Sequence, residues 1–182
     1  MKATAVSAAI AGLLAAFPAA AVTPAVGSAP PAADVPHIEF AFEERVTISP
    51  AVVLGETAFG HRQYIPITGG TVAGPKLKGQ VLPGGWDFQL TYSASKCTQL
   101  SADYFLKADD GTVIHVFNEG LFCPGAERSY FRPRLEAPKG AHDWLTRATF
   151  VATLEIEAPA QAPPGGTPPP VEAVRIRFYQ VK

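Results

Sequence analysis

The chain has 182 residues, a mass of 19.2 kDa and a formal net charge of −1, which is the size of one domain. Hydrophobic residues make up 47% and charged residues 17%, so the chain can bury a core and is not a disordered polymer. The near-neutral charge excludes a protein that binds nucleic acid through a basic surface. The 16 glycines and 18 prolines exclude a helical bundle, because both residues break helices.

The N-terminus has the pattern of a targeting segment. Lys2 precedes a small and apolar run, Ala3–Ala21, whose last residues, Ala19-Ala20-Ala21, fit a cleavage site. The most apolar part, Val6–Phe17, has about 12 residues and is shorter than the ~20 that a membrane anchor needs. We therefore predict a signal peptide at 1–21, a periplasmic or secreted protein, and no membrane attachment after cleavage.

Two further segments are rich in proline. Residues 22–36 carry one charge and no hydrophobic period, which is typical of a flexible or polyproline-II leader. Residues 158–170 (APAQAPPGGTPPP) contain six prolines and cannot pair in a sheet, so they predict a loop. Residues 37–182 form the predicted domain.

Most of that domain has the period of β-strands. In His37–Ser49 the even positions are apolar and most odd ones are polar, with Glu44 as the only polar residue at an even position. This alternation indicates antiparallel strands with one buried face. Further strand-like runs follow at Arg62–Thr68, Thr71–Leu82, Trp86–Tyr92, Leu100–Ala108, Thr112–Asn118, Ser129–Leu135, Leu145–Glu157 and Val171–Val181.

Turn residues separate these runs. Gly69-Gly70 predicts a two-residue hairpin, Pro83-Gly84-Gly85 a turn, and Asp109-Asp110-Gly111 a hairpin whose glycine supplies a positive φ. Gly74-Pro75 predicts a bulge or bend inside the third run. Strands in sequence, with no helical period between them, exclude alternating βαβ units. They favour an all-β, single antiparallel up-and-down β-barrel, because closure removes the edge strands; a Greek-key sandwich is the alternative.

The two cysteines, Cys97 and Cys123, are compatible with one disulfide in an exported protein. In the chain-entropy model a bridge between them would stabilise the fold by about 3 kcal/mol. Their spacing alone leaves open whether they are bridged, and it matches no zinc site. The four histidines show no ligand spacing either, so we expect no metal and no cofactor.

Several motifs occur in a characteristic order. They are Tyr64–Gly79, Leu82–Asp87, Asp103-Tyr104 with Ala108–Gly111 and Gly120, Tyr130–Pro133, and Trp144-Leu145. Over roughly Phe40 to Val181 this order resembles the domain-of-unknown-function 3237 family (UPF0311-like). The resemblance implies a single calycin-like barrel. Some fungal relatives assist ring closure on aromatic polyketides, so the resemblance also makes a cofactor-free acid/base catalyst an expectation.

Asp87 is the first candidate for such chemistry. It follows Trp86 after a glycine turn, and a carboxylate in a partly desolvated barrel mouth has a raised pKa that suits a general acid or base. The alternative is a turn carboxylate that binds local amides.

Tyr130 and Arg132 are the candidates for holding a developing anion, because they lie two residues apart on one face of a strand. Tyr130 and Arg132 alternate with the apolar residues Phe131 and Pro133, and this pattern by itself would put Tyr130 and Arg132 on the exterior face.

The remaining candidates would contact a ligand. Trp86 and Trp144 could stack on a flat molecule, although Trp144 could equally plug the barrel end. Further candidates lie at motif positions, on an apolar strand face or at the barrel rim: Tyr64, Tyr104, His115 and Glu119.

Three functions remain open. The first is an enzyme for isomerisation, cyclisation or addition/elimination on a flat phenolic or carbonyl substrate. The second is a lipocalin-like barrel that binds a small molecule without chemistry. The third is a structural or partner-binding module that uses 158–170 as its contact. A cavity of a few hundred Å³ with converging polar groups would favour the first.

Overall fold

The structure is a computed structural model and describes residues 31–32, 35–157 and 171–182. The chain divides into two units, Met1–Val35 and Pro36–Lys182, and the fold described here is that of the second. Its described residues form ten strands and one short helix: β1 Ile38–Ile48, β2 Val52–Thr57, β3 Gly60–Ala73, β4 Gly79–Val81, β5 Trp86–Thr91, β6 Thr98–Ala108, β7 Val113–Phe122, β8 Tyr130–Glu136, α1 Trp144–Arg147, β9 Phe150–Ile156 and β10 Ala173–Val181.

The strands form one closed antiparallel barrel with neighbours in chain order. β1 pairs with β10 on one side and with β3 on the other, which closes the sheet. Two positions in the barrel are each shared by two strands: β1 and β2 pair with successive parts of β3, and β4 and β5 both lie between β3 and β6. The ten strands therefore occupy eight positions. The predicted up-and-down barrel is confirmed, and a sandwich is excluded.

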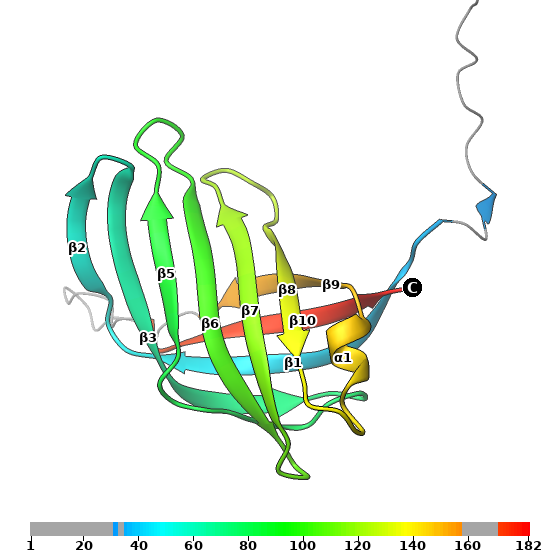
Figure 1. Cartoon of the computed structure of the whole chain (residues 1–182). Coiled ribbons are helices and arrows are strands. Elements are labelled where there is room, and N and C mark those ends of the chain that lie inside the picture. The colour runs from blue at the N-terminus through cyan, green and yellow to red at the C-terminus, as the bar shows by residue number, and fades with distance from the viewer. Residues whose placement is uncertain (1–30, 33–34, 158–170) are drawn as a thin grey trace, which may run out of the picture. The chain divides into compact units, whose positions relative to one another are not determined.

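Figure 1 shows β2, β3 and β5–β8 side by side, with β1, β9 and β10 crossing behind them at a steep angle. Side chains alternate between the inside and the outside, so that Phe131, Pro133 and Leu135 of β8 are buried while Tyr130 and Arg132 are exposed. The alternation that predicted strands also decides which side chains can reach the interior.

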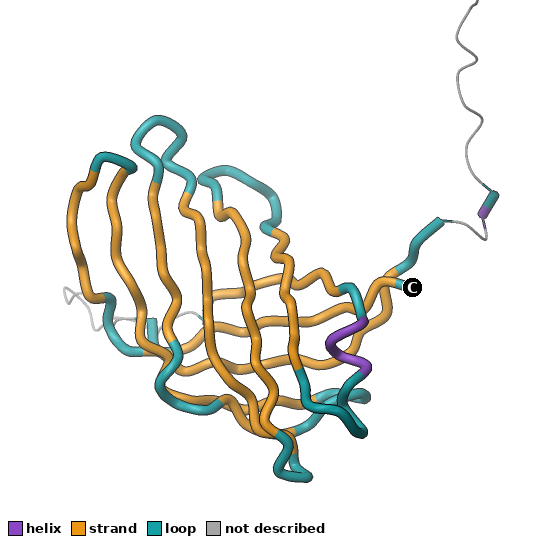
Figure 2. Tube along the Cα trace, viewed as in Figure 1, coloured by secondary structure: helices purple, strands orange, loops and turns teal. Residues whose placement is uncertain are grey.

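One end of the barrel is packed solid. Phe42 stacks on Phe178 with ring centroids 4.4 Å apart, and it meets the edge of Phe150 at 6.3 Å. The short helix α1, purple in Figure 2, lies at this end and buries Leu145 completely. These side chains close one end of the barrel and leave any open space to the other end.

The Gly69-Gly70 hairpin prediction is wrong. β3 runs through both glycines, which have φ values of +138° and +148°. Gly70 pairs with Val46, and a Cβ there would collide with the carbonyl oxygen of Arg45. Two glycines can thus mark a strand under close backbone approach as well as a turn.

Other turn predictions are confirmed. Gly84 and Gly111 have φ values of +101° and +89° in the predicted turns between β4 and β5 and between β6 and β7. The bend at Gly74-Pro75 is also present, and β3 ends just before it. β2 was not predicted, and the run from Leu145 begins in α1, because Leu145 fits a buried position in either element.

Cys97 and Cys123 are bonded. They flank the paired residues Thr98 and Phe122, so the disulfide ties the start of β6 to the end of β7. Beside the paired strands β1 and β10, the backbones of His37 and Lys182 exchange two hydrogen bonds, at 3.1 and 2.8 Å.

Some predictions lie outside the described residues. These are the signal peptide 1–21, most of the leader 22–36, and the loop 158–170 with its suggested partner contact. Among the residues that are described, no helix has the length and apolarity needed to cross a bilayer.

Candidate functional site

A cavity of about 290 Å³ lies inside the barrel. It extends toward the end where β6 begins and where β7 and β9 end, opposite the aromatic packing. Its wall is largely apolar and includes Val46, Ile48, Ile65, Ile67, Leu100, Ala102, Phe122, Phe131, Leu154, Ile156, Val171, Val174 and Ile176. Five polar side chains interrupt this wall: Asp87, Gln89, Thr98, Tyr104 and Asn118. The arrangement is that of a small-molecule site, in which apolar walls hold a ligand and a few polar groups orient it.

Asp87 is held rigidly on the cavity wall. Its Oδ1 accepts a hydrogen bond of 2.9 Å from the backbone N–H of Ser101, and its Oδ2 accepts one of 2.8 Å from Nε2 of Gln89. Gln63 in turn donates to Gln89 at 2.7 Å, which fixes the orientation of that amide. Burial raises the pKa of Asp87 to about 6, although both hydrogen bonds act to lower it. This carboxyl group can therefore exchange a proton near neutral pH.

A second carboxyl group lies beneath the cavity. The hydroxyl of Tyr104 on β6 donates to Oε2 of Glu44 on β1 at 2.6 Å, across the barrel interior. Burial raises the pKa of Glu44 to about 8, against the lowering effect of this bond. Burial and then the Glu44 charge raise the pKa of Tyr104. Glu44 is therefore protonated near neutral pH, and the pair marks the boundary between the cavity and the packed end.

Asn118 completes the polar part of the wall. It is 2% exposed, and its Oδ1 has no hydrogen-bond partner among the described residues. The strand register places it in line with Asp87, because Asp87 pairs with Ala102 and Ala102 pairs with Asn118. Asp87 and Asn118 therefore face the cavity on either side of one small methyl group.

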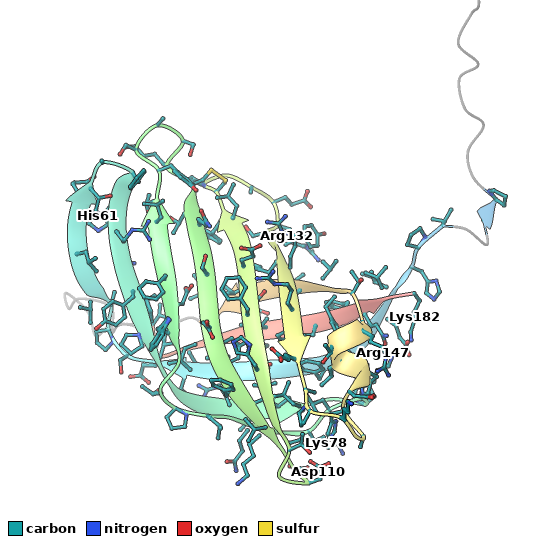
Figure 3. All side chains as sticks on the ribbon, in the orientation of Figure 1. His61, Lys78, Asp110, Arg132, Arg147 and Lys182 are labelled. Atoms are coloured by element: carbon teal, nitrogen blue, oxygen red, sulfur yellow. A yellow bond between two sulfur atoms is a disulfide. The ribbon has the colours of Figure 1, made fainter. Side chains whose placement is uncertain are left out.

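The structure does not bring Tyr130 and Arg132 to this cavity. Tyr130 is 60% exposed, and Arg132 lies on the exterior of β8 (Figure 3), at 3.6 Å from Glu119. The predicted convergence of either residue with Asp87 is wrong, because the inward positions of β8 belong to Phe131 and Pro133.

Trp86 and Tyr64 also lie on the exterior. Trp86 is 45% exposed and meets the edge of Phe88, which in turn lies near Tyr64. Their side chains alternate with Asp87 and Ile65, whose side chains line the cavity. Neither aromatic residue can therefore contact a ligand bound there.

His115 and Trp144 contact other residues of the barrel and do not line the cavity. Nε2 of His115 lies 2.7 Å from Asp103 on the outer face, whereas Ile114 and Val116 point to the core. Trp144 packs at 6.0 Å from Phe150 at the closed end, so it plugs the barrel and does not stack on a ligand. Of the predicted ligand contacts, Tyr104 alone reaches the cavity.

Sequence reasoning missed Glu44, Gln89 and Asn118 as site residues. A signal was present for two of them, because Glu44 is the one polar residue at an even position of its strand and Asn118 follows Ile114 and Val116 at the inward period. Burying a polar residue at an inward position costs free energy, so such a residue is a candidate for a functional role.

Comparisons with known proteins agree with this architecture. The model of the family described as "Protein of unknown function (DUF3237)" matches residues 36–181. The chain belongs to the DUF3237 family. A UPF0311 protein of Rhodopseudomonas palustris is 34% identical over 136 residues, which cover 66% of this chain and 88% of that protein. A UPF0311 protein of Clostridium acetobutylicum is 39% identical over 86 residues, 47% of this chain, and that match spans about half of the relative's length (54%).

The DUF3237 fold is shared by solved structures, and one relative is named as an enzyme. A β-barrel-like protein of Acinetobacter baumannii superposes with a TM-score of 0.70 at 25% identity, covering 85% of this chain and 99% of that one. The hydroalkoxylation enzyme phnH of Penicillium herquei is 27% identical over 170 residues, 93% of this chain and 95% of its own. The chain is thus a DUF3237 barrel with a distant enzyme relative.

Proposed function

We propose that this DUF3237 barrel binds a small, flat and largely apolar molecule in its cavity, and that Asp87 acts on it as a general base and then as a general acid. One observation carries the proposal: a carboxyl group with a pKa of about 6 stands on the wall of an otherwise apolar cavity. A group whose pKa lies near the working pH is efficient both in taking a proton and in returning it.

The surroundings of Asp87 suit this role. The Ser101 amide and the Gln89 side chain each bind one of its oxygens, so the carboxylate keeps one orientation while lone pairs remain for a substrate. The apolar wall excludes water, which strengthens the interaction of the carboxylate with a substrate proton. Phe122 and Phe131 on the wall take the place that Trp86 and Trp144 were expected to fill.

The reaction class is a proton-transfer isomerisation, cyclisation or addition. Hydroalkoxylation, the activity in the name of the Penicillium herquei relative, adds an alcohol O–H across a carbon–carbon double bond. The O–H bond and the π bond of the alkene break, a C–O and a C–H bond form, and the proton moves from oxygen to carbon. No oxidant or reductant is needed, so a single carboxyl group that accepts and returns one proton balances the reaction.

The test uses two commercial probes, 1-tetralone for exchange of its α-hydrogens in D₂O and 2-allylphenol for closure to the dihydrobenzofuran. We expect the protein to accelerate at least one reaction, with a rate that rises as the pH passes about 6 and Asp87 loses its proton. Asp87→Asn should lower the rate by about 100-fold or more. NMR measures the exchange, and gas chromatography with mass detection measures the closure.

Asp103→Asn is the matched control, because it removes the same charge from the exterior face of the neighbouring strand. Equal loss of rate in both variants would refute a role for Asp87. Binding of the probes without any reaction would instead support the second candidate, a carrier of small molecules, which the largely apolar wall favours.

We also propose that the protein works after export. The signal-like residues 1–21 and the disulfide between Cys97 and Cys123 support this, since disulfides persist in oxidising compartments. N-terminal sequencing of protein from the host's extracytoplasmic fraction tests it: a mature chain that starts near Val22 is expected, and an intact chain found only in the cytoplasm would contradict it.

A further inference from the structure

A glycine faces an aromatic ring on the cavity wall. Gly120 lies at an inward position of β7, two residues from Asn118 and two from Phe122. Its partner in the strand register is Phe131 of β8, which is 1% exposed and lines the cavity. A Cβ at Gly120 would collide with Cδ1 of Phe131 and would lie 2.8 Å from Cγ and Cε1 of the same ring. The ring therefore occupies the place that a side chain at position 120 would take.

The backbone at Gly120 does not itself require glycine. Gly120 has no positive φ and lies within a regular strand, so an alanine could adopt the same backbone conformation. The requirement comes from the ring, since an aromatic side chain can lie over a glycine on the neighbouring strand. Gly120 differs in this from Gly70, where the obstacle is the backbone of β1. A side chain at position 120 would thus displace the Phe131 ring and leave the strands in place.

The open space next to the Phe131 ring is the cavity. On the side away from Gly120, Phe131 pairs with Ala152, which is completely buried and pairs in turn with Phe178 of the packed end. Along β8 the next inward residue, Pro133, is buried as well. A ring displaced from Gly120 is therefore blocked on these two sides and turns into the cavity that it lines.

We propose that Gly120 is the residue that determines ligand size: it leaves room for the Phe131 ring against the wall and so keeps the cavity open to a flat ligand of three fused rings. The proposal rests on the proposed function, because it assumes that the cavity holds a ligand, and it adds the size class of that ligand. At about 290 Å³ the cavity is near the lower end of the range for ligand sites, so a ring turned into it would exclude the larger molecules.

Two ketones test the role of Gly120. Xanthone has three fused rings, and 1-tetralone has two. We expect the wild-type protein to bind both. Gly120→Ala should weaken the binding of xanthone about tenfold or more, because overpacking a filled site typically has a cost of this size, and should weaken that of 1-tetralone less than about twofold. Equilibrium dialysis measures the affinities.

A second substitution shows whether the ring transmits the effect. Phe131→Leu removes the ring, so in this background Gly120→Ala should change the affinity for xanthone by less than about twofold. Gly111→Ala is the matched control, because a Cβ there meets nothing within 4 Å and lies in a turn outside the cavity wall. It should leave both affinities unchanged.

The Phe131→Leu background also serves if Gly120→Ala alone fails to fold, because the smaller side chain relieves the collision. There Gly120→Leu fills the same space from β7 and should exclude xanthone while 1-tetralone still binds. Binding of xanthone to this double variant as tightly as to Phe131→Leu would overturn the role of Gly120.

The outcomes separate the two proposals. Equal losses for the two ketones in Gly120→Ala, no loss for either, or a loss of xanthone binding that persists with Phe131→Leu overturns the role of Gly120 and leaves the cavity function standing. The same holds if the wild-type protein binds 1-tetralone but not xanthone. Absence of binding of either ketone to the wild-type protein overturns both proposals.

Discussion

A buried carboxyl group beside a tyrosine couples the stability of the barrel to pH. Glu44 is completely buried, its Oε1 has no partner among the described residues, and its pKa is raised to about 8. In the unfolded chain the group has its ordinary value of 4.5. Between these two values the folded state binds more protons than the unfolded state, so the unfolding free energy falls as the pH rises.

We predict that Glu44→Gln removes most of this pH dependence. Glutamine can still accept the hydrogen bond of Tyr104 but carries no charge. Between about pH 5 and about pH 8.5 the wild type should lose on the order of 3 kcal/mol more stability than the variant. Urea unfolding at the two pH values measures this.

Glu136→Gln, on the exterior face of β8, is the control and should keep the wild-type slope. Equal slopes in the wild type and in Glu44→Gln would show that Glu44 is not the group that titrates.

At this scale the sequence predicted part of the site. Asp87 could be placed at the cavity, since a carboxylate beside a glycine turn enters a strand at the barrel mouth. The side chains of Tyr130 and Arg132 have the chemistry needed to bind an anion, but their alternation with Phe131 and Pro133 already indicated the exterior face of the strand. Asn118 and Glu44 were missed because a pattern search treats polar residues at inward positions as noise.

At the scale of the element, β3 is the strand on which the barrel is organised. It pairs with four other strands, and it can do so because Gly69 and Gly70 let it bend while it continues to pair. The sequence predicted nearly every strand by its period of two, but it could not tell a glycine pair at a turn from a glycine pair at a bend. That difference depends on the backbone of β1, which arrives from elsewhere in the chain.

We predict that Gly70→Ala destabilises the barrel far more than Gly111→Ala. A Cβ at Gly70 would meet the backbone of β1, which cannot move without breaking the sheet, whereas a Cβ at Gly111 meets nothing within 4 Å. Gly111→Ala should cost about 1 kcal/mol from backbone strain alone, and Gly70→Ala about 3 kcal/mol or more. Urea unfolding of both variants gives the difference, and comparable losses would contradict the steric explanation.

At the scale of the whole molecule, the disulfide strengthens the open half of the barrel. The aromatic residues pack the other end, while Thr98 and Phe122, next to the two cysteines, line the cavity. The disulfide therefore holds the start of β6 against the end of β7 beside the cavity, away from the packed aromatic end. The sequence left the pairing of the cysteines open, because only the register of β6 and β7 brings them together.

Replacing Cys97 and Cys123 with alanine should lower the unfolding free energy by about 3 kcal/mol and weaken the binding of 1-tetralone. Urea unfolding and calorimetry measure the two effects. Wild-type protein treated with a reductant should behave like the variant, and the variant itself should not respond to the reductant. Unchanged binding in the variant would mean that the bond stabilises the fold without shaping the cavity.

The hydrogen bonds between His37 and Lys182 have a consequence for how the cavity comes into being. Every hairpin of the barrel can form from residues close in sequence, but the seam between β1 and β10 joins the two extremes of the domain and raises its contact order. During synthesis the hairpins of the early strands can form in chain order. The barrel stays open between β1 and the growing chain until β10 has been made and can pair with β1. The barrel can thus enclose a guest molecule only after β10 has been synthesised.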